Sequence, residues 1–174
     1  LKGVVVLGIG NLLRRDDGVG VTVARRVRDA LEPSGSVEIR TGLADVTDFL
    51  DAWRGGRKVV AIDALRATSF GSPPEATGTA GARPGRIHRL NPLEEALPPQ
   101  LAPSSSHAFG IREALDLGGA LGDLPSELVL IGIEGGEFGH GEGLTPEVES
   151  SVEEATRMVL GQVAQMREDP GMDA

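Results

Sequence analysis

Three side chains occupy positions in the sequence where chemistry is expected. Asp17 follows a short glycine–asparagine turn, Asp63 comes directly after four apolar residues, and His107 follows a run of serines. Two carboxylates and one imidazole are ligands suited to zinc, nickel, manganese or iron. Three protein ligands also leave coordination positions open, as a catalytic metal site requires. This set therefore indicates a metal-centred site.

Each of these side chains also has a purely structural interpretation. The apolar neighbours of Asp63 desolvate its carboxylate at a cost in free energy, and backbone N–H groups of a nearby loop could compensate for it as well as a cation could. Asp16 and Asp17 could both stabilise the first turn of a helix through its dipole. The residues alone leave open which of the two has another role. A histidine near a helix start, such as His107, is commonly an ordinary surface side chain.

Two other chemistries compete for the same residues. The glycines at 8 and 10 suggest dinucleotide binding, but that fingerprint needs a third glycine where Leu13 stands and an acid where Arg40 and Thr41 stand. Those glycines also suit a tight turn with a close backbone approach. A serine protease would use one of Ser104 to Ser106 with His107, yet no G-x-S-x-G elbow is present.

The other two histidines are expected at the surface. His88 lies in a modest strand-like segment, and His140 lies in the glycine-rich stretch from Gly135 to Gly141. That stretch is expected beside the same crevice as the three candidate side chains.

Composition removes several classes of function. The chain has 174 residues and no cysteine, which excludes disulfides, thiolate metal sites and a cysteine nucleophile and fits a reducing, cytoplasmic compartment. A formal net charge of −9 disfavours nucleic acid and anionic membranes as partners. No apolar run approaches the length of a membrane span or a signal peptide. We expect one domain over residues 1–174, acting as a monomer.

The elements that must position these residues alternate between strands and helices. Buried strands are predicted at 4–9, 37–41, 58–64, 87–90 and 128–133. Helices are predicted from about Asp17 to Leu31, over the segments beginning near Val46 and after the serines 104–106, and from Thr145-Pro146 onward. This order predicts an α/β fold with an open, mostly parallel five-stranded sheet and helices on both faces, a three-layer sandwich. Residues 67–85 are expected to form a mobile loop, and 168–174 a frayed tail.

Two motifs give this sequence a resemblance to a known family. Residues 8–20, G-I-G-N-L-L-R-R-D-D-G-V-G, resemble the N-terminal signature G-x-G-N-x-L-x-x-D-[DE]-x-x-G of the hydrogenase maturation proteases. The segments around Asp63, Ser106-His107 and G-L-T-P at 143–146 extend the likeness over nearly the whole chain.

The resemblance implies an enzyme, a fold and a site. Members of this family remove a C-terminal extension from the large-subunit precursor of nickel–iron hydrogenases after nickel insertion, and their fold is an open α/β sheet. Their metal-contacting positions match Asp17, Asp63 and His107 here, so the resemblance favours Asp17 over Asp16. The metal is nickel supplied by the substrate, or another divalent transition metal.

One departure from the family pattern suggests rival hypotheses. The family carries approximately D-G-G-T after its second strand, whereas Thr41 and Leu43 replace the acid and a glycine here. If that acid takes part in cleavage, this chain cuts by a different route, has an altered substrate, or is a binding module that recognises the metal-loaded precursor without cleaving it. A nucleotide-binding oxidoreductase is the third hypothesis.

Overall fold

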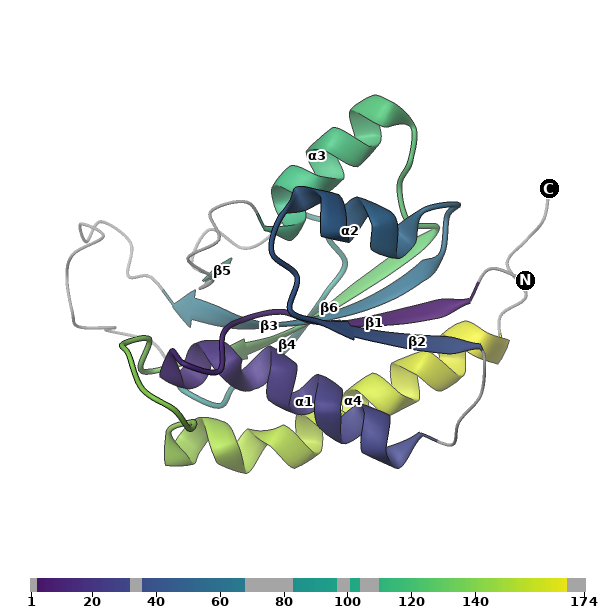
Figure 1. Ribbon diagram of the computed structural model, residues 1–174. Helices are drawn as coiled ribbons and strands as arrows, with labels where there is room; N and C mark the ends of the chain where they lie inside the picture. The colour runs from purple at the N-terminus through teal and green to yellow at the C-terminus, as the bar shows by residue number, and fades with distance from the viewer. Residues whose placement is uncertain (1–2, 32–35, 68–82, 97–100, 104–109, 169–174) are drawn as a thin grey trace.

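The computed structural model describes residues 3–31, 36–67, 83–96, 101–103 and 110–168 (Figure 1). Its elements along the chain are β1 (Val4–Gly8), the 3-10 turn η1 (Arg15–Gly18), α1 (Val19–Ala30), β2 (Val37–Thr41), α2 (Val46–Trp53), β3 (Lys58–Ala67), β4 (Ile87–Leu90), β5 (Leu101–Pro103), α3 (Ile111–Leu121), β6 (Glu127–Glu134) and α4 (Pro146–Glu168). Within these residues, none of the helices combines the length and apolar character that a membrane crossing needs.

The described strands form one open sheet in the order β2-β1-β3-β6-β4. The first four of these strands run parallel, β4 pairs antiparallel with β6, and the short β5 pairs antiparallel with the end of β3. The predicted five-stranded, mostly parallel sheet is therefore confirmed, with β5 as a further strand. β5 has only three residues, Leu-Ala-Pro, which show no alternation that a sequence pattern could reveal.

Helices cover both faces of the sheet, as Figure 1 shows. On one face α1 and α4 pack against alternate residues of β1, β3 and β6, and on the other face α2 and α3 pack against the intervening residues. The central strands are apolar on both sides because both sides are buried, which is why their sequences read as continuous apolar runs.

Two predicted helix boundaries are corrected by the structure, and a third is confirmed. Residues 15–18 form a 3-10 turn, so the first α-helix begins at Val19 rather than Asp17. The serines 104–106 do not cap α3, because its N-cap is Gly110, whose N–H donates to Glu113 Oε2 at 2.8 Å. α3 therefore starts four residues beyond His107. The prediction of α4 from Pro146 is confirmed.

The predicted mobile loop and frayed tail fall mostly outside the described residues. Of the loop 67–85, residues 68–82 are outside, Ala67 still belongs to β3, and the N–H of Gly85 donates to Glu134 O at 2.8 Å. Of the tail 168–174, only Glu168 is described, as the last residue of α4.

Candidate functional site

Asp63 lies on β3 at the point where the neighbouring strand ends. β1 pairs with β3 only as far as Gly8, opposite Ile62, and β5 joins that side of β3 from Leu65 onward. The predicted strand 58–64 is longer in the structure, because pairing with β6 reaches Leu65 and pairing with β5 reaches Ala67. The connections through α1 and α2 cross opposite faces of the sheet, so this is the topological switch point where open α/β sheets bind ligands.

Glycines bring the start of α1 against the end of β1 and the middle of β3. A Cβ atom added at Gly20 would lie 2.3 Å from Ile9 O and 2.4 Å from Ile62 O. A Cβ at Gly8 would lie 2.8 Å from the carbonyl oxygen of Gly20. Because neither site has room for a side chain, helix and strand backbones touch directly. The turn that carries Asp17 directly precedes this part of α1 and is thereby held near the middle of β3, where Asp63 follows Ile62.

The turn between β1 and α1 fixes the carboxylate of Asp17. Gly10 has φ +123°, and a Cβ there would lie 1.8 Å from Asp17 O, so the chain folds tightly back on itself. The N–H of Asn11 donates to Asp17 Oδ2 at 3.0 Å, and the N–H of Asp17 donates to Arg14 O at 3.1 Å. The first and last residues of the turn are thus tied together, with Asp17 fully buried.

Asp63 is an unusual acid because it is buried, is affected by the charge of Asp17 and has an oxygen without a hydrogen-bond partner among the described residues. Its side chain is 3% exposed. Burial, and then the charge of Asp17, raise the pKa of Asp63 to about 8, against a smaller lowering by the Ala64 N–H. Within the described residues, Asp63 Oδ1 is buried without a hydrogen-bond partner. Two buried carboxylates that repel each other, one with an oxygen left over, fit a cation.

Asp16 is also buried but has a different environment from Asp17. Its two oxygens accept hydrogen bonds from the N–H groups of Gly136, Glu137 and Thr145 at 2.8, 2.9 and 2.7 Å. The hydroxyl of Thr145 donates to the same carboxylate at 3.0 to 3.1 Å. These donors saturate Asp16, whereas it is the charge of Asp17 that acts on Asp63.

Comparison with known proteins identifies the family to which this arrangement belongs. A sequence model described as hydrogenase maturation protease matches residues 76–162. The hydrogenase expression/formation protein HupD of Thiocapsa roseopersicina is 31% identical over 180 residues, covering 98% of this chain and 75% of the relative. The chain belongs to the hydrogenase maturation protease family.

Two further comparisons agree that the chain belongs to this family of proteases. The hydrogenase 2 maturation protease of Escherichia coli is 30% identical over 162 residues, covering 90% of this chain and 88% of the relative. The solved structure of the hydrogenase maturating endopeptidase HybD from E. coli superposes with a TM-score of 0.69 at 25% identity, covering 94% of this chain and 93% of that one. The nucleotide-binding oxidoreductase hypothesis is therefore discarded, and the protein is a protease.

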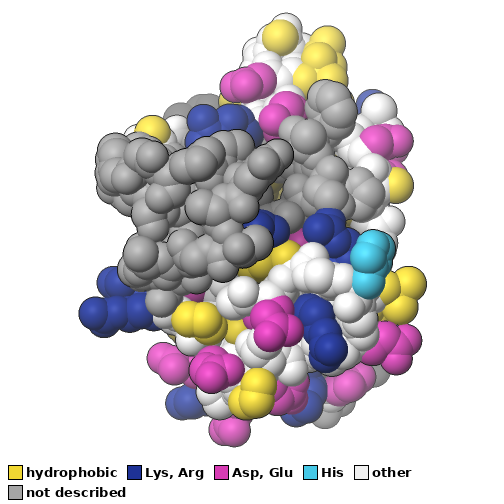
Figure 2. All heavy atoms as spheres, turned by 90° about the vertical axis from the view of Figure 1, so that its left-hand side faces the viewer, with side chains coloured by type: hydrophobic (Ala, Val, Ile, Leu, Met, Phe, Trp, Pro, Cys, Tyr) yellow, Lys and Arg dark blue, Asp and Glu magenta, His cyan; other side chains and the backbone are white. Residues whose placement is uncertain are grey.

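The third predicted ligand of the protease lies outside the described residues. His107 falls in 104–109, so the structure leaves its convergence with Asp17 and Asp63 untested. Among the residues that are described, no group of three or more histidines or acids is arranged to hold a metal ion. The metal set of Asp17, Asp63 and His107 thus stays a prediction. Figure 2 looks onto this end of the molecule, where visible acidic and basic side chains are interspersed.

The other histidines divide between surface and interior. His140 is exposed, as predicted. His88 is half-buried, and its Nε2 lies 2.6 Å from Oε1 of the buried Glu134 at the end of β6, so its prediction as a surface residue is wrong. Glu134 also accepts the N–H of Arg83 at 2.8 Å, which anchors the start of the segment leading to β4.

Thr41 ends β2 at the same edge of the sheet as the acidic pair. It lies opposite Gly8 in the β1–β2 register, and its Cγ2 is 3.1 Å from the position a Cβ of Gly8 would take. The residue that departs from the family pattern therefore borders the turn that carries the site.

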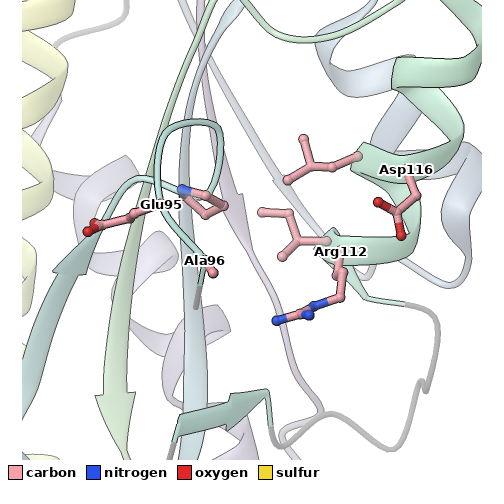
Figure 3. A pocket seen from close by; sticks show the side chains of 7 residues that line it. Glu95, Ala96, Arg112 and Asp116 are labelled. Carbon is pink, nitrogen blue, oxygen red and sulfur yellow. The ribbon is translucent and has the colours of Figure 1, made fainter. Parts of the chain in front are cut away.

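A separate shallow pocket lies between α3 and the segment after β4. Its volume is about 170 Å³, and it is lined by Pro92, Glu95, Ala96, Ile111, Arg112, Leu115 and Asp116. In Figure 3 the Arg112 side chain extends from α3 into the space beside Ala96. The lining residues include neither Asp17 nor Asp63, so this pocket is distinct from the candidate site.

Proposed function

We propose that this protease removes the C-terminal extension of a nickel–iron hydrogenase large-subunit precursor after nickel insertion, reading the metal through Asp17, Asp63 and His107. The observation that carries the proposal is the buried pair Asp17 and Asp63 at the switch point, where Asp63 Oδ1 has no partner among the described residues. The family assignment supplies the class of substrate.

A divalent cation suits this pair better than any donor the described residues supply. Burial and mutual repulsion both oppose two negative charges at the site, as the raised pKa of Asp63 reflects. A positive ion reverses both effects because it compensates for lost hydration and attracts both carboxylates. Nickel held in the precursor meets this need, and another divalent transition metal would meet it with the same ligands.

The described residues act as a prepared receptor for that ion. The Asn11 N–H holds one oxygen of Asp17, and the Ala64 N–H acts on Asp63. When bound, the ion would polarise the scissile carbonyl or activate a water molecule. A precursor without the metal would offer the two acids no cation to bind, and recognition would fail through that difference in affinity.

A cleavage assay on matched precursors tests the proposal. The protease is incubated with nickel-loaded and nickel-free large-subunit precursor, and the loss of mass is followed by mass spectrometry. We expect processing of the loaded form only, and no processing by His107→Ala or Asp63→Asn variants whose thermal melts match wild type. Equal processing of the two precursor forms would overturn the proposal that the protease recognises the precursor through its nickel.

The non-cleaving binding module is discarded, because the family to which the chain belongs consists of proteases. Thr41 nevertheless stands at the sheet edge where the family carries an acid. We expect Thr41→Asp to accelerate cleavage of the nickel-loaded precursor if an acid at this position takes part in the reaction, and the rate of mass loss measures this.

A further inference from the structure

Asp16 joins two parts of the chain that are about 120 residues apart in sequence. Its Oδ2 accepts the N–H groups of Gly136 and Glu137, and its Oδ1 accepts the N–H of Thr145. The two sets of donors belong to opposite ends of the segment between β6 and α4. A single buried carboxylate therefore closes this segment at both ends.

Backbone hydrogen bonds attach the same segment along the signature turn. The N–H of Asp16 donates to Glu137 O at 3.0 Å, and that of Arg15 donates to Gly141 O at 2.9 Å. In return, Gly141 N–H donates to Leu13 O at 2.9 Å. Residues 13–16 are thus paired with 137–141 by main chain, and the Asp16 side chain completes the connection.

The surroundings of Asp16 suit an aspartate. A Cβ added at Gly135 would lie 2.9 Å from the Cβ of Asp16, so Gly135 lies close against Asp16 and a side chain at position 135 would press on it. Thr145 directly precedes Pro146, the first residue of the 23-residue helix α4, whose positive dipole end favours a carboxylate. An asparagine has the right size but would direct its NH2 group at N–H donors.

We propose that Asp16 is a positioning residue that holds Asp17 in its site by clamping the signature turn to the 135–145 segment. Asp16 is adjacent to Asp17, and the turn containing both is fixed at its other end by the Asn11 N–H on Asp17 Oδ2. Without the side-chain hydrogen bonds of Asp16, the turn keeps its internal bonds and the main-chain bonds to residues 137–141, but it loses its connection to Thr145. The clamp also explains why the G-L-T-P motif at 143–146 accompanies the signature: its threonine is the partner of Asp16.

Hydrogen exchange at one amide tests the clamp without depending on activity. The Asn11 N–H reports on Asp17 because it donates to Asp17 Oδ2. In Asp16→Asn we expect its exchange to accelerate by at least about tenfold while amides of the central strands stay protected. Val159→Ala is the matched control, since Val159 is fully buried in α4 and distant in sequence from the turn. Unchanged Asn11 exchange in Asp16→Asn would overturn the proposal.

Cleavage kinetics supply the second readout, which rests on the proposed function. We expect Asp16→Asn to lower kcat on nickel-loaded precursor by about 10- to 100-fold, as a displaced site group does. Thr145→Val, which removes the hydroxyl donor, should lower kcat less than Asp16→Asn does. Thr145→Ser, which keeps the hydroxyl, should have a kcat close to that of wild type. Val159→Ala should keep the wild-type kcat even if its melting temperature falls by as much as that of Asp16→Asn. A loss that merely follows the melting temperature in all four variants would refute positioning.

The two readouts separate the failure of one proposal from the failure of the other. A wild-type protein that cleaves no precursor would refute the proposed function, and the Asn11 exchange would still decide the clamp. Normal cleavage by wild type together with normal cleavage by Asp16→Asn would refute the clamp alone.

Discussion

Asp63 differs from an ordinary buried acid in the number of its donors. Asp16, nearby in the fold, is equally buried and is satisfied by three N–H groups and a hydroxyl. Asp63 has one oxygen without a partner among the described residues and has the charge of Asp17 beside it. A polar group buried in this way is destabilising unless a ligand completes it.

Replacing Asp63 by asparagine should therefore cost no stability in the metal-free protein. The substitution keeps the shape and removes the buried charge and its repulsion from Asp17. We expect the melting temperature of Asp63→Asn at pH 8 to equal or exceed that of wild type, by up to about 5 °C. Thermal melts in the presence of a chelator measure this. A much lower melting temperature would mean that Asp63 stabilises the fold.

The same carboxyl predicts a pH dependence of stability. Its pKa is about 8 in the folded protein against 3.8 for an ordinary aspartate, so the folded chain holds a proton that the unfolded chain has lost between these values. Stability from this group is thus present at low pH and is lost as pH rises from about 4 to 8, with a slope of at most about 1.4 kcal/mol per pH unit.

Urea denaturation of metal-free wild type and Asp63→Asn across that range measures the effect. As pH rises, the free energy of unfolding of wild type should fall relative to that of Asp63→Asn. Parallel curves for the two proteins would show that Asp63 titrates normally.

At the level of single residues, the sequence pattern indicated Asp63 and the pair Asp16 and Asp17, and it left open which acid of the pair has a role beyond the helix start. Asp16 and Asp17 are adjacent acids with the same local pattern, and only the distant donors at 136, 137 and 145 distinguish them. The Asn11 N–H is equally invisible in a sequence because it is a backbone group. The burial of His88 depends on Glu134, 46 positions away, which no local pattern reports.

At the level of elements, the position of α1 depends on two glycines at sites that have no room for a side chain. Gly20 on the helix lies against the carbonyl oxygens of Ile9 and Ile62, and Gly8 on the strand lies against Gly20. Dinucleotide binding was one interpretation of such glycines, but here the space they leave is filled by the protein itself. Their role is to bring α1, and the turn before it that carries Asp17, close to β3.

Gly20→Ala should consequently destabilise the fold and separate the two acids. The added Cβ meets two backbone oxygens at 2.3 and 2.4 Å that can move only with their strands. We expect a loss of about 3 kcal/mol in the free energy of unfolding. Gly161→Ala is the matched control, since nothing lies within 4 Å of its added Cβ on α4, and it should stabilise by about 0.5 to 1 kcal/mol.

Urea denaturation of both alanine variants measures these changes. A Gly20→Ala variant as stable as wild type would show that α1 can shift away from the sheet at little cost. Its cleavage activity would then reveal whether the separation of Asp17 from Asp63 matters.

Strands and helices were predictable to the extent that their signals are local. The apolar runs of β1, β3 and β6 reflect burial on two faces, and Thr145-Pro146 marks the start of α4. The extension of β3 to Ala67 was not predictable because it depends on pairing with β6 and with the three residues of β5. The start of α3 was missed since its cap is a glycine helped by Glu113 rather than a serine.

At the level of the whole molecule, the chain is organised around one edge of the sheet. β1 lies between β2 and β3, and the chain crosses opposite faces to reach them, which places the signature turn, the end of β2 and Asp63 together. The two hydrophobic clusters on either side of the sheet hold this edge in place. Every feature assigned to the site except His107 therefore follows from strand order.

The chemistry available to the whole chain predicts its response to inhibitors. The sequence contains no cysteine, so alkylating agents have no thiolate to modify. In the part of the chain that the structure describes, the hydroxyls of Ser150 and Ser151 donate to carbonyls within α4 and are committed to that helix. We expect iodoacetamide and a fluorophosphonate to leave cleavage of nickel-loaded precursor unchanged, under conditions that inactivate papain and trypsin. A chelator able to extract the precursor's nickel should abolish it, and adding nickel back should restore it. Stoichiometric labelling of one serine with loss of cleavage would instead revive the serine-protease alternative at 104–106, because only a nucleophile activated by a neighbouring base reacts in that way.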